Sequence, residues 1–272
     1  MRMIPWGIAA IAILVIPAEA KGFDGASYSV FKSESAWYHS VVADLNRTHI
    51  TPTAHYSPRL TYASKAIAER QPIAAITGTF FAYENHQPVA DVVIDGVAKA
   101  YGNRGSVLAV DWFGNAKIID VPVRQDMDFF AYRYALRGMV RIVSSGKVGA
   151  NPRAQGFRDP AISGSAARTA VGLTKNNKII LVATSQHVTL SELGRAMVAR
   201  GAHDAVCLDG GGSTMLYFMG SIKVEPKRPL STLFMIENRS PYDDTFKAHM
   251  SRIGWNQASG AAAKALAQAS GQ

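Results

Sequence analysis

Short apolar runs separated by turn residues dominate the pattern of hydrophobic and polar positions between residues 25 and 240. Runs of this kind, bounded by glycine, proline, asparagine or aspartate, are typical of β-strands. Asp95-Gly96, Gly114-Asn115 and Asn176-Asn177 each separate two such runs, and each predicts the turn of a β-hairpin. The strands that we expect lie in residues 21–32, 38–45, 48–53, 73–77, 89–94, 97–101, 106–111, 116–121, 140–144, 169–174, 178–184, 205–208, 215–219 and 232–237.

Two segments have the apolar spacing of an amphipathic helix. In residues 57–70, Ala63, Ala66 and Ile67 share one face, and Pro72 follows the segment. The second helix is predicted to begin at the capping box Thr189-Leu190-Ser191-Glu192 and to end at Gly201, between two apolar strands.

The order of these elements predicts an α/β (mixed α+β) fold, a single domain of mixed sheets with packed helices over residues 25–240. We also expect residues 126–138 to be at least partly helical. Residues 151–167 have no regular pattern and contain two prolines and two glycines. An irregular segment of this length is more often a functional or mobile loop than a linker.

Both ends of the chain differ from the middle. Arg2, the apolar residues 6–16 and the small residues of Ala18-Glu19-Ala20 are the parts of a signal peptide, so we expect residues 1–20 to be removed. The apolar run is shorter than the roughly 20 residues of a membrane-spanning helix, although an uncleaved anchor is the alternative. Residues 241–272, alanine-rich toward the end, are expected to form a tail outside the domain. The mature protein is expected to be periplasmic or secreted, without stable membrane insertion.

The net charge of +9 does not by itself identify a binding partner. The basic residues are scattered, which argues against a nucleic-acid-binding arm. They either form a solvated basic surface or attract an anionic substrate. Cys207 is the only cysteine, so a disulfide within the chain is excluded, and its place in an apolar strand predicts a buried structural thiol.

The segment most typical of a functional site follows this strand. There Asp209 precedes three consecutive glycines, Ser213 and Thr214. Glycine reaches positive φ values and lets backbone amides approach a bound group. The segment is therefore either a tight turn or the floor of a pocket in which Asp209 acts as an acid, a base or a ligand. The preceding strand–helix–strand unit places Asp209 at the carboxyl end of a strand, where α/β sheets bind ligands.

This segment resembles the LDGGGS/T signature of the phosphodiester glycosidase family. Residues 42–45, 76–81, 167–172, 189–205 and 227–232 resemble other segments of that family in the same order, so that the resemblance covers about residues 41–236. The sequence departs from the family at Thr77, where many members have asparagine, and at Ala90-Asp91, where many have a glycine.

The resemblance implies a hydrolase that cleaves a sugar from a sugar-1-phosphate diester. The family's best-known member, a lysosomal enzyme, uncovers mannose 6-phosphate by removing N-acetylglucosamine, and bacterial relatives are often associated with exopolysaccharides. The implied partner is a small-molecule or polysaccharide phosphodiester, with no nucleic acid.

Asp209 and Arg168 are expected to be the central catalytic residues. Arg168 offers a two-pronged donor to phosphate, or else forms a structural ion pair with Asp159 or Asp209. Glycoside cleavage usually uses a second carboxylate, for which Glu84 and Asp91 are the nearest candidates. The remaining residues that we expect to bind substrate are Gly78, Thr79, His187, Gly210, Gly211, Gly212, Ser213, Thr214 and Arg228. His187 is also the histidine that we would test first as a proton shuttle.

Two other functions remain open at this stage. The chain could be a non-catalytic polysaccharide-binding or biosynthesis-accessory protein on the same fold. It could also be a phosphodiesterase in which Asp209, Glu84 and Asp91 hold Ca²⁺, since oxygen ligands suit this ion. We expect no cofactor otherwise, and the metal ligands, if there are any, are unknown.

Overall fold

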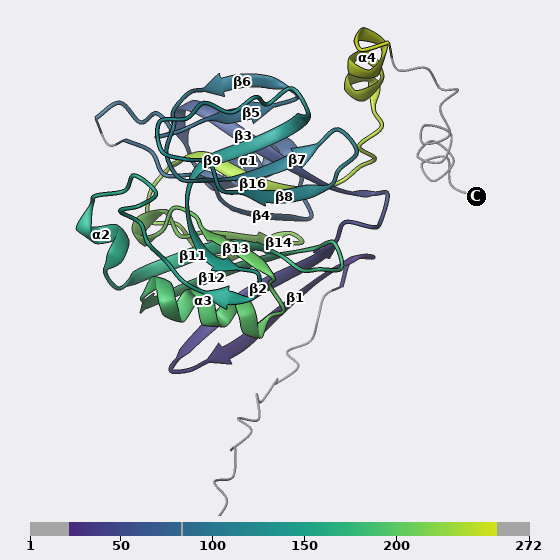
Figure 1. The fold of residues 1–272 in the computed structure, drawn as a ribbon. Helices are drawn as coiled ribbons and strands as arrows, with labels where there is room; N and C mark the ends of the chain where they lie inside the picture. Colours follow the sequence, from purple (N-terminus) through teal and green to yellow (C-terminus); the bar gives the residue numbers. More distant parts are fainter. Residues whose placement is uncertain (1–21, 83, 255–272) are drawn as a thin grey trace, which may run out of the picture.

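The framework of the protein is a pair of stacked β-sheets, seen in a computed structural model that describes residues 22–82 and 84–254 (Figure 1). The strands are β1 (Ala26–Ser33), β2 (Ala36–Asp44), β3 (Ile50–Thr61), β4 (Ala74–Thr77), β5 (Val92–Ile94), β6 (Val97–Ala100), β7 (Ser106–Asp111), β8 (Ala116–Ile119), β9 (Tyr132–Ser144), β10 (Lys147–Val148), β11 (Ala166–Leu173), β12 (Lys178–Val188), β13 (Asp204–Cys207), β14 (Leu216–Phe218), β15 (Ser221–Val224) and β16 (Leu230–Asn238). The helices are α1 (Ala63–Arg70), α2 (Pro160–Ser163), α3 (Leu190–Ala199) and α4 (Asp244–Arg252), with a 3₁₀ turn, η1, at Gly211–Ser213.

The larger sheet has the strand order β1-β2-β12-β11-β13-β9-β5-β6, and β9 also pairs with β10 and β7. The smaller sheet has the order β15-β14-β4-β16-β3. All strand pairs within the described residues are antiparallel. The expected mixture of sheets and packed helices is therefore correct in outline, but strands account for more of the protein than we expected.

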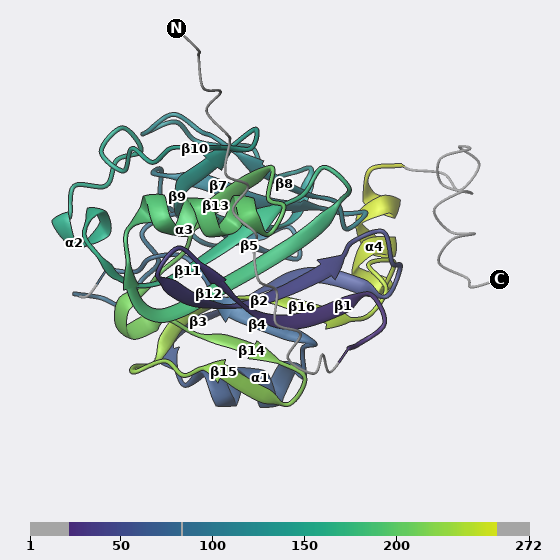
Figure 2. The ribbon, with the colours of Figure 1, turned by 90° about the horizontal axis from the view of Figure 1, so that it is seen from below.

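The main core lies between the two sheets. Val41, Leu181 and Val206 of the larger sheet are fully buried in one cluster with Ile76 and Phe234 of the smaller sheet. The strands that contribute these residues are rich in apolar side chains, because both faces of the strands are covered. Figure 2 shows α3 against the outer face of the larger sheet and α1 beneath the smaller sheet.

Several local predictions are confirmed. The expected hairpins correspond to β5–β6, β7–β8 and β11–β12. The capping box is present, because the Thr189 hydroxyl accepts from the Glu192 amide at 3.2 Å and the Thr189 amide donates to the Glu192 carboxylate at 2.7 Å. Helix α3 connects β12 to β13, and β13 pairs with β11. The strand–helix–strand unit thus places Asp209 just beyond the carboxyl end of β13.

Two helix predictions are wrong, one entirely and one in its first residue. Residues 126–138 are not helical, and from Tyr132 they belong to β9, which pairs with four other strands. The first helix begins at Ala63 and not near residue 57, because the chain up to Thr61 is still strand β3. Pro58 lies where the pairing of β3 with β16 shifts register, which fits a residue that lacks an amide hydrogen.

Folded structure continues past the boundary that we predict at residue 240. Helix α4 packs Phe246 and Met250 against Trp112, and the Asp243 carboxylate at its start accepts from Arg133 at 2.7 Å. The predicted signal peptide and the residues after 254 lie outside the described part of the chain. None of the helices in residues 22–82 and 84–254 has both the length and the apolar character needed to span a bilayer.

The ends of β4 and β13 meet at Gly78, and this contact connects the two sheets. The Gly78 amide donates to the carbonyl of Thr232 at 2.9 Å, and the Gly78 carbonyl accepts from the Asp209 amide at 3.0 Å. A Cβ atom at Gly78 would lie 2.4 Å from the Thr232 hydroxyl and 3.0 Å from the Thr232 backbone. Glycine is therefore required here by close backbone approach.

We expect Gly78→Ala to lower the free energy of unfolding by about 1–3 kcal/mol, the usual cost of overpacking a core. Thermal or urea denaturation measures the change. Gly149→Ala is the matched control, because a Cβ at that glycine meets nothing within 4 Å. Equal stability of the two variants would show that the contact between the sheets tolerates a side chain at Gly78.

Candidate active site

The Asp209 carboxylate is the acidic group at the centre of the candidate site. Its Oδ1 accepts from the Gly210 amide at 2.9 Å, and its Oδ2 accepts from Arg228 Nη2 at 3.4 Å. Burial raises the pKa of Asp209, whereas a hydrogen bond with Ser213, the charge of Arg228 and the Gly210 amide oppose the rise. The net shift is upward, so Asp209 is a stronger base than an exposed aspartate.

The three glycines shape the backbone around this carboxylate. A Cβ atom at Gly210 would lie 2.6 Å from the carbonyl oxygen of Ala167, and Gly211 has a φ of +58°. Gly212 lies under the Arg228 side chain, and its carbonyl accepts from the Lys227 amide at 2.8 Å. The consecutive glycines thus bring the turn close to β11 and leave room for Arg228.

Arg228 connects the turn to the opposite loop. Its Nε donates to the Ser213 hydroxyl at 2.7 Å, and its guanidinium lies over the Phe81 ring, 4.8 Å from the centroid. The side chain is only partly exposed, so its charge acts on Asp209 with limited screening by water. Arg228, which the sequence predicts to bind substrate, therefore forms an ion pair with Asp209.

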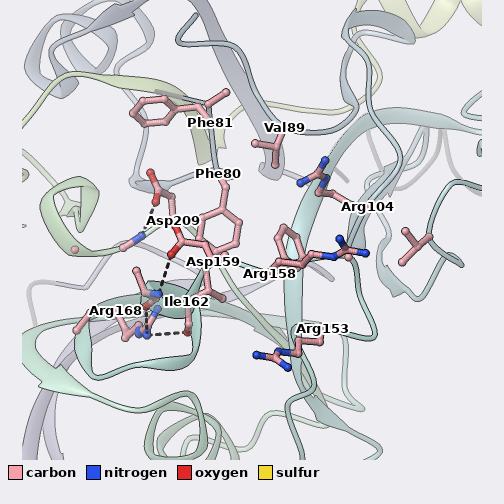
Figure 3. A pocket seen from close by; sticks show the side chains of 18 of the residues that line it. Phe80, Phe81, Val89, Arg104, Arg153, Arg158, Asp159, Ile162, Arg168 and Asp209 are labelled. Carbon is pink, nitrogen blue, oxygen red and sulfur yellow. Dashed lines mark hydrogen bonds between the residues drawn. The ribbon is translucent and has the colours of Figure 1, made fainter. Parts of the chain in front are cut away.

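A cavity of about 1010 Å³ opens in front of this pair (Figure 3). Six arginines and three carboxylates line it, together with the glycine turn and the Phe80 and Phe157 rings. The charged lining residues are Arg104, Arg124, Arg153, Arg158, Arg168, Arg228, Glu84, Asp159 and Asp209. The cavity is of a size that holds a small-molecule ligand, and its positive excess favours an anion.

Arg168 reaches the cavity wall, but its guanidinium is engaged by the backbone. It is buried and donates to the carbonyls of Ile162 at 2.9 Å and Ala161 at 3.3 Å, and also to Gly164. These carbonyls lie in and just after α2. Within the described residues no ion pair joins Arg168 to Asp159 or Asp209, so the structural role is to hold the loop rather than to neutralise a carboxylate.

The structure brings together about half of the predicted site residues. Those that line the cavity are Asp209, Arg168, Glu84, Gly210, Gly211, Gly212 and Arg228. Those that do not line it are Asp91, Gly78, Thr79, His187, Ser213 and Thr214.

Most residues of the second group support the site from behind. Thr79 is buried, and its hydroxyl donates to the carbonyl of Gly138 at 3.1 Å. Ser213 and Thr214 are buried in the glycine turn. His187 lies exposed near the end of β12, away from the cavity lining. The expected direct contact of these residues and Gly78 with substrate is therefore not what the geometry shows.

The structure places the Asp91 carboxylate outside the cavity lining and pairs it inside the protein. Its Oδ2 lies 3.3 Å from Arg137 Nη1, and its Oδ1 accepts from the Gly102 amide at 3.1 Å. Arg137 is fully buried and also donates to the carbonyls of Gln125 at 2.8 Å and Pro122 at 3.2 Å. The pair fixes two loops that lead to the cavity.

The sequence reasoning missed four lining arginines: Arg104, Arg124, Arg153 and Arg158. Two of them lie in the irregular residues 151–167, so the prediction of a functional loop there was the signal that could have found them. The other two lie in connections between strands and carry no local signature, because only the tertiary structure brings those connections to the cavity.

Two further expectations can be compared with the geometry. Cys207 is buried, and burial raises the pKa of its thiol to about 11, which agrees with a structural thiol.

In the part of the chain that the structure describes, no three acidic, histidine or cysteine side chains gather as a possible set of metal ligands. The carboxylates of the alternative calcium site are not gathered, because Asp91 is paired with Arg137.

Comparisons with known proteins place these observations in a family. The phosphodiester glycosidase family model, NAGPA, matches residues 70–237, which include Asp209 and the glycine turn. No curated protein matches the chain in a sequence search.

Solved structures share the fold at low sequence identity. The auto-inhibited catalytic domain of zebrafish N-acetylglucosamine-1-phosphodiester alpha-N-acetylglucosaminidase is 18% identical with a TM-score of 0.64, over 79% of this chain and 82% of that one. A hypothetical protein from Synechocystis is 13% identical with a TM-score of 0.67, over 81% and 64% of the two chains. A putative exported protein from Burkholderia pseudomallei is 13% identical with a TM-score of 0.54, over 78% and 74%.

We expect Arg168→Lys to lower the free energy of unfolding by about 2–3 kcal/mol. Lysine keeps the charge but cannot reach several carbonyls at once, so buried acceptors around α2 lose their donor. Urea denaturation measures the loss. Arg158→Lys is the matched control on the same loop, because that arginine is exposed and makes no ion pair or side-chain hydrogen bond within the described residues. Unchanged stability of Arg168→Lys would show that the loop does not depend on the guanidinium.

Proposed function

Because this chain belongs to the phosphodiester glycosidase family, we propose that it is a hydrolase that removes a sugar from a sugar-1-phosphate diester. The observation that supports the proposal is the Asp209–Arg228 pair at the wall of a cavity that is rich in arginine. A carboxylate and a guanidinium side by side suit a substrate in which an anomeric carbon is bonded to an anionic phosphate.

The proposed reaction breaks the bond between the anomeric carbon and the phosphate oxygen. A water oxygen bonds to the anomeric carbon, and the phosphate monoester leaves with the bonding electron pair. Asp209 accepts the proton of the attacking water, and the raised pKa of Asp209 favours this role as a general base. Arg228 donates to the phosphate, where negative charge increases as the bond breaks.

The leaving group explains why the site can rely on a single well-placed carboxylate. Most glycosidases need a second carboxylic acid to protonate a strongly basic alkoxide leaving group. A phosphate monoester is a much weaker base, so guanidinium groups can stabilise its departure without transferring a proton. Glu84 lines the same cavity and is exposed, and we assign it a secondary role beside Asp209.

We also propose that the protein works outside the cytoplasm on cell-surface or exopolysaccharide material. The support for this is the signal-peptide pattern of residues 1–20. Anionic polymers of the cell surface are chemically compatible with a cationic cavity and a net charge of +9.

We expect Asp209→Asn to lower kcat at least about 10²-fold on a cleavable diester, the low end for the loss of a general base. The melting temperature should not fall, because burial already disfavours the charged carboxylate that asparagine replaces. The measurement is phosphate-monoester release from a panel of sugar-1-phosphodiesters in ¹⁸O water. Asp244→Asn, an exposed substitution in α4, is the control for a charge change remote from the site.

Each arm of this experiment discriminates between alternatives. Cleavage at carbon leaves the phosphate product unlabelled, whereas cleavage at phosphorus labels it. Loss of activity after dialysis against a chelator, with recovery on added Ca²⁺, would favour the calcium-assisted phosphodiesterase. Binding of every diester without turnover by the unmodified protein would favour the non-catalytic polysaccharide-binding function.

Expression of residues 1–272 tests the proposed export. We expect intact-mass analysis of the periplasmic or secreted fraction to show a chain that begins at Lys21, because signal peptidases cleave after small residues such as Ala20. A protein that keeps Met1 and is recovered in the membrane fraction would contradict both cleavage and release.

A further inference from the structure

The cavity contains more positive charge than one phosphodiester requires. Arg228 and Arg168 lie at the Asp209 end, but Arg104, Arg124, Arg153 and Arg158 also line the wall. These four side chains are exposed, and none of them makes an ion pair or a side-chain hydrogen bond with another described residue. Four unpaired guanidinium groups on one cavity repel each other, and a bound anion would relieve that repulsion.

These arginines are separated from the catalytic carboxylate by an aromatic pair. Figure 3 shows Arg104, Arg153 and Arg158 on the opposite side of the cavity from Asp209. The Phe80 ring lies between the two groups and packs edge-on against Phe157, with 5.5 Å between the ring centroids. The cavity therefore has two polar ends and an apolar middle.

The arginine end is held in place by the folded protein. The Arg124 amide donates to the carbonyl of Asn103 at 2.8 Å, and the Gly105 amide donates to the carbonyl of Gln155 at 3.0 Å. Three separate segments of the chain are thus hydrogen-bonded to one another beneath the arginines. The buried guanidinium of Arg137 adds bonds to the carbonyls of Gln125 and Pro122. Because these bonds fix the backbone, binding of an anion orders the arginine side chains but not the loops that carry them.

The volume of the cavity and the position of its positive charge indicate which part of the substrate reaches the arginine end. A volume of about 1010 Å³ lies at the upper end of the range for drug-sized ligands, so a sugar phosphate leaves space unfilled. The proposed reaction places the sugar carbon at Asp209 and the phosphate at Arg228. The remaining space lies toward the four arginines, and the alcohol that the phosphate carries, the aglycone, is the part of the substrate that can fill it.

We propose that Arg104, Arg124, Arg153 and Arg158 form a subsite for a second anionic group on the aglycone, so that the substrate is a diester with at least two negative charges. This inference rests on the proposed function for the identity of the first group, the phosphodiester. Carboxylate and phosphate are the two forms of the second group that guanidinium forks recognise. A segment of an anionic surface polymer has this chemistry.

The test compares three diesters of N-acetylglucosamine 1-phosphate whose aglycones are propyl, 3-carboxypropyl and 2-phosphonoethyl. Dissociation constants are measured by titration calorimetry on the Asp209→Asn protein, which prevents turnover. We expect at least one charged aglycone to bind at least about tenfold more tightly than propyl, the effect of one or more charge-assisted hydrogen bonds. The better of the two charged compounds identifies the anion.

The same titrations on two variants assign the preference to residues. Adding Arg153→Gln and Arg158→Gln together is expected to reduce the ratio to within about twofold. Lys247→Gln and Arg252→Gln together, an equal charge change at exposed positions of α4, should leave the ratio unchanged. Circular dichroism verifies that each variant is folded. Equal binding of all three diesters, or a ratio that survives the double substitution, would overturn the inference.

The outcome separates this inference from the proposed function. A preference for the charged aglycone in binding, together with no cleavage of any diester by the unmodified protein, would support the subsite and reject the hydrolase. Cleavage of the diesters without such a preference would support the hydrolase and reject the subsite.

Discussion

The hydrogen bond from the Asp209 amide to the Gly78 carbonyl is the constraint on which the candidate site depends. It joins the end of a strand in the larger sheet to the end of a strand in the smaller one, and it exists only because Gly78 has no side chain to collide with Thr232. The Thr169 hydroxyl holds the Asp209 carbonyl at 2.5 Å from the neighbouring strand. With both backbone groups fixed, Asp209 is held at the wall of the cavity.

A second constraint comes from buried guanidinium groups, which need complete hydrogen bonding to be tolerated inside a protein. Arg137 and Arg168 meet this need largely with loop carbonyls rather than carboxylates. Each therefore fixes irregular backbone that has no sheet partner of its own. The loops held in this way carry the exposed arginines of the cavity. The buried guanidinium groups of Arg137 and Arg168 therefore fix the backbone from which the exposed arginines extend.

The sequence predicted what depends on local pattern and missed what depends on distant contacts. Hairpin turns, the Thr189 capping box and the glycine turn after Asp209 are encoded within a few residues. By contrast, residues 126–138 were expected to be at least partly helical, whereas from Tyr132 they belong to β9, whose strand partners are distant in the sequence. The pairing of Asp91 could not be predicted for the same reason, because its partner Arg137 lies 46 residues away.

The Asp209–Arg228 pair also resolves a conflict in the proposed chemistry. A general base must be ionised and basic, yet an ionised carboxylate repels an anionic substrate at close range. Burial raises the pKa of Asp209 and so makes it basic, while Arg228 at 3.4 Å offsets its charge toward an approaching phosphate. A stronger, shorter ion pair would lower the pKa and weaken the base, and the absence of any cation would exclude the phosphate. The partly exposed Arg228, shared between Asp209, Ser213 and the Phe81 ring, lies between these extremes.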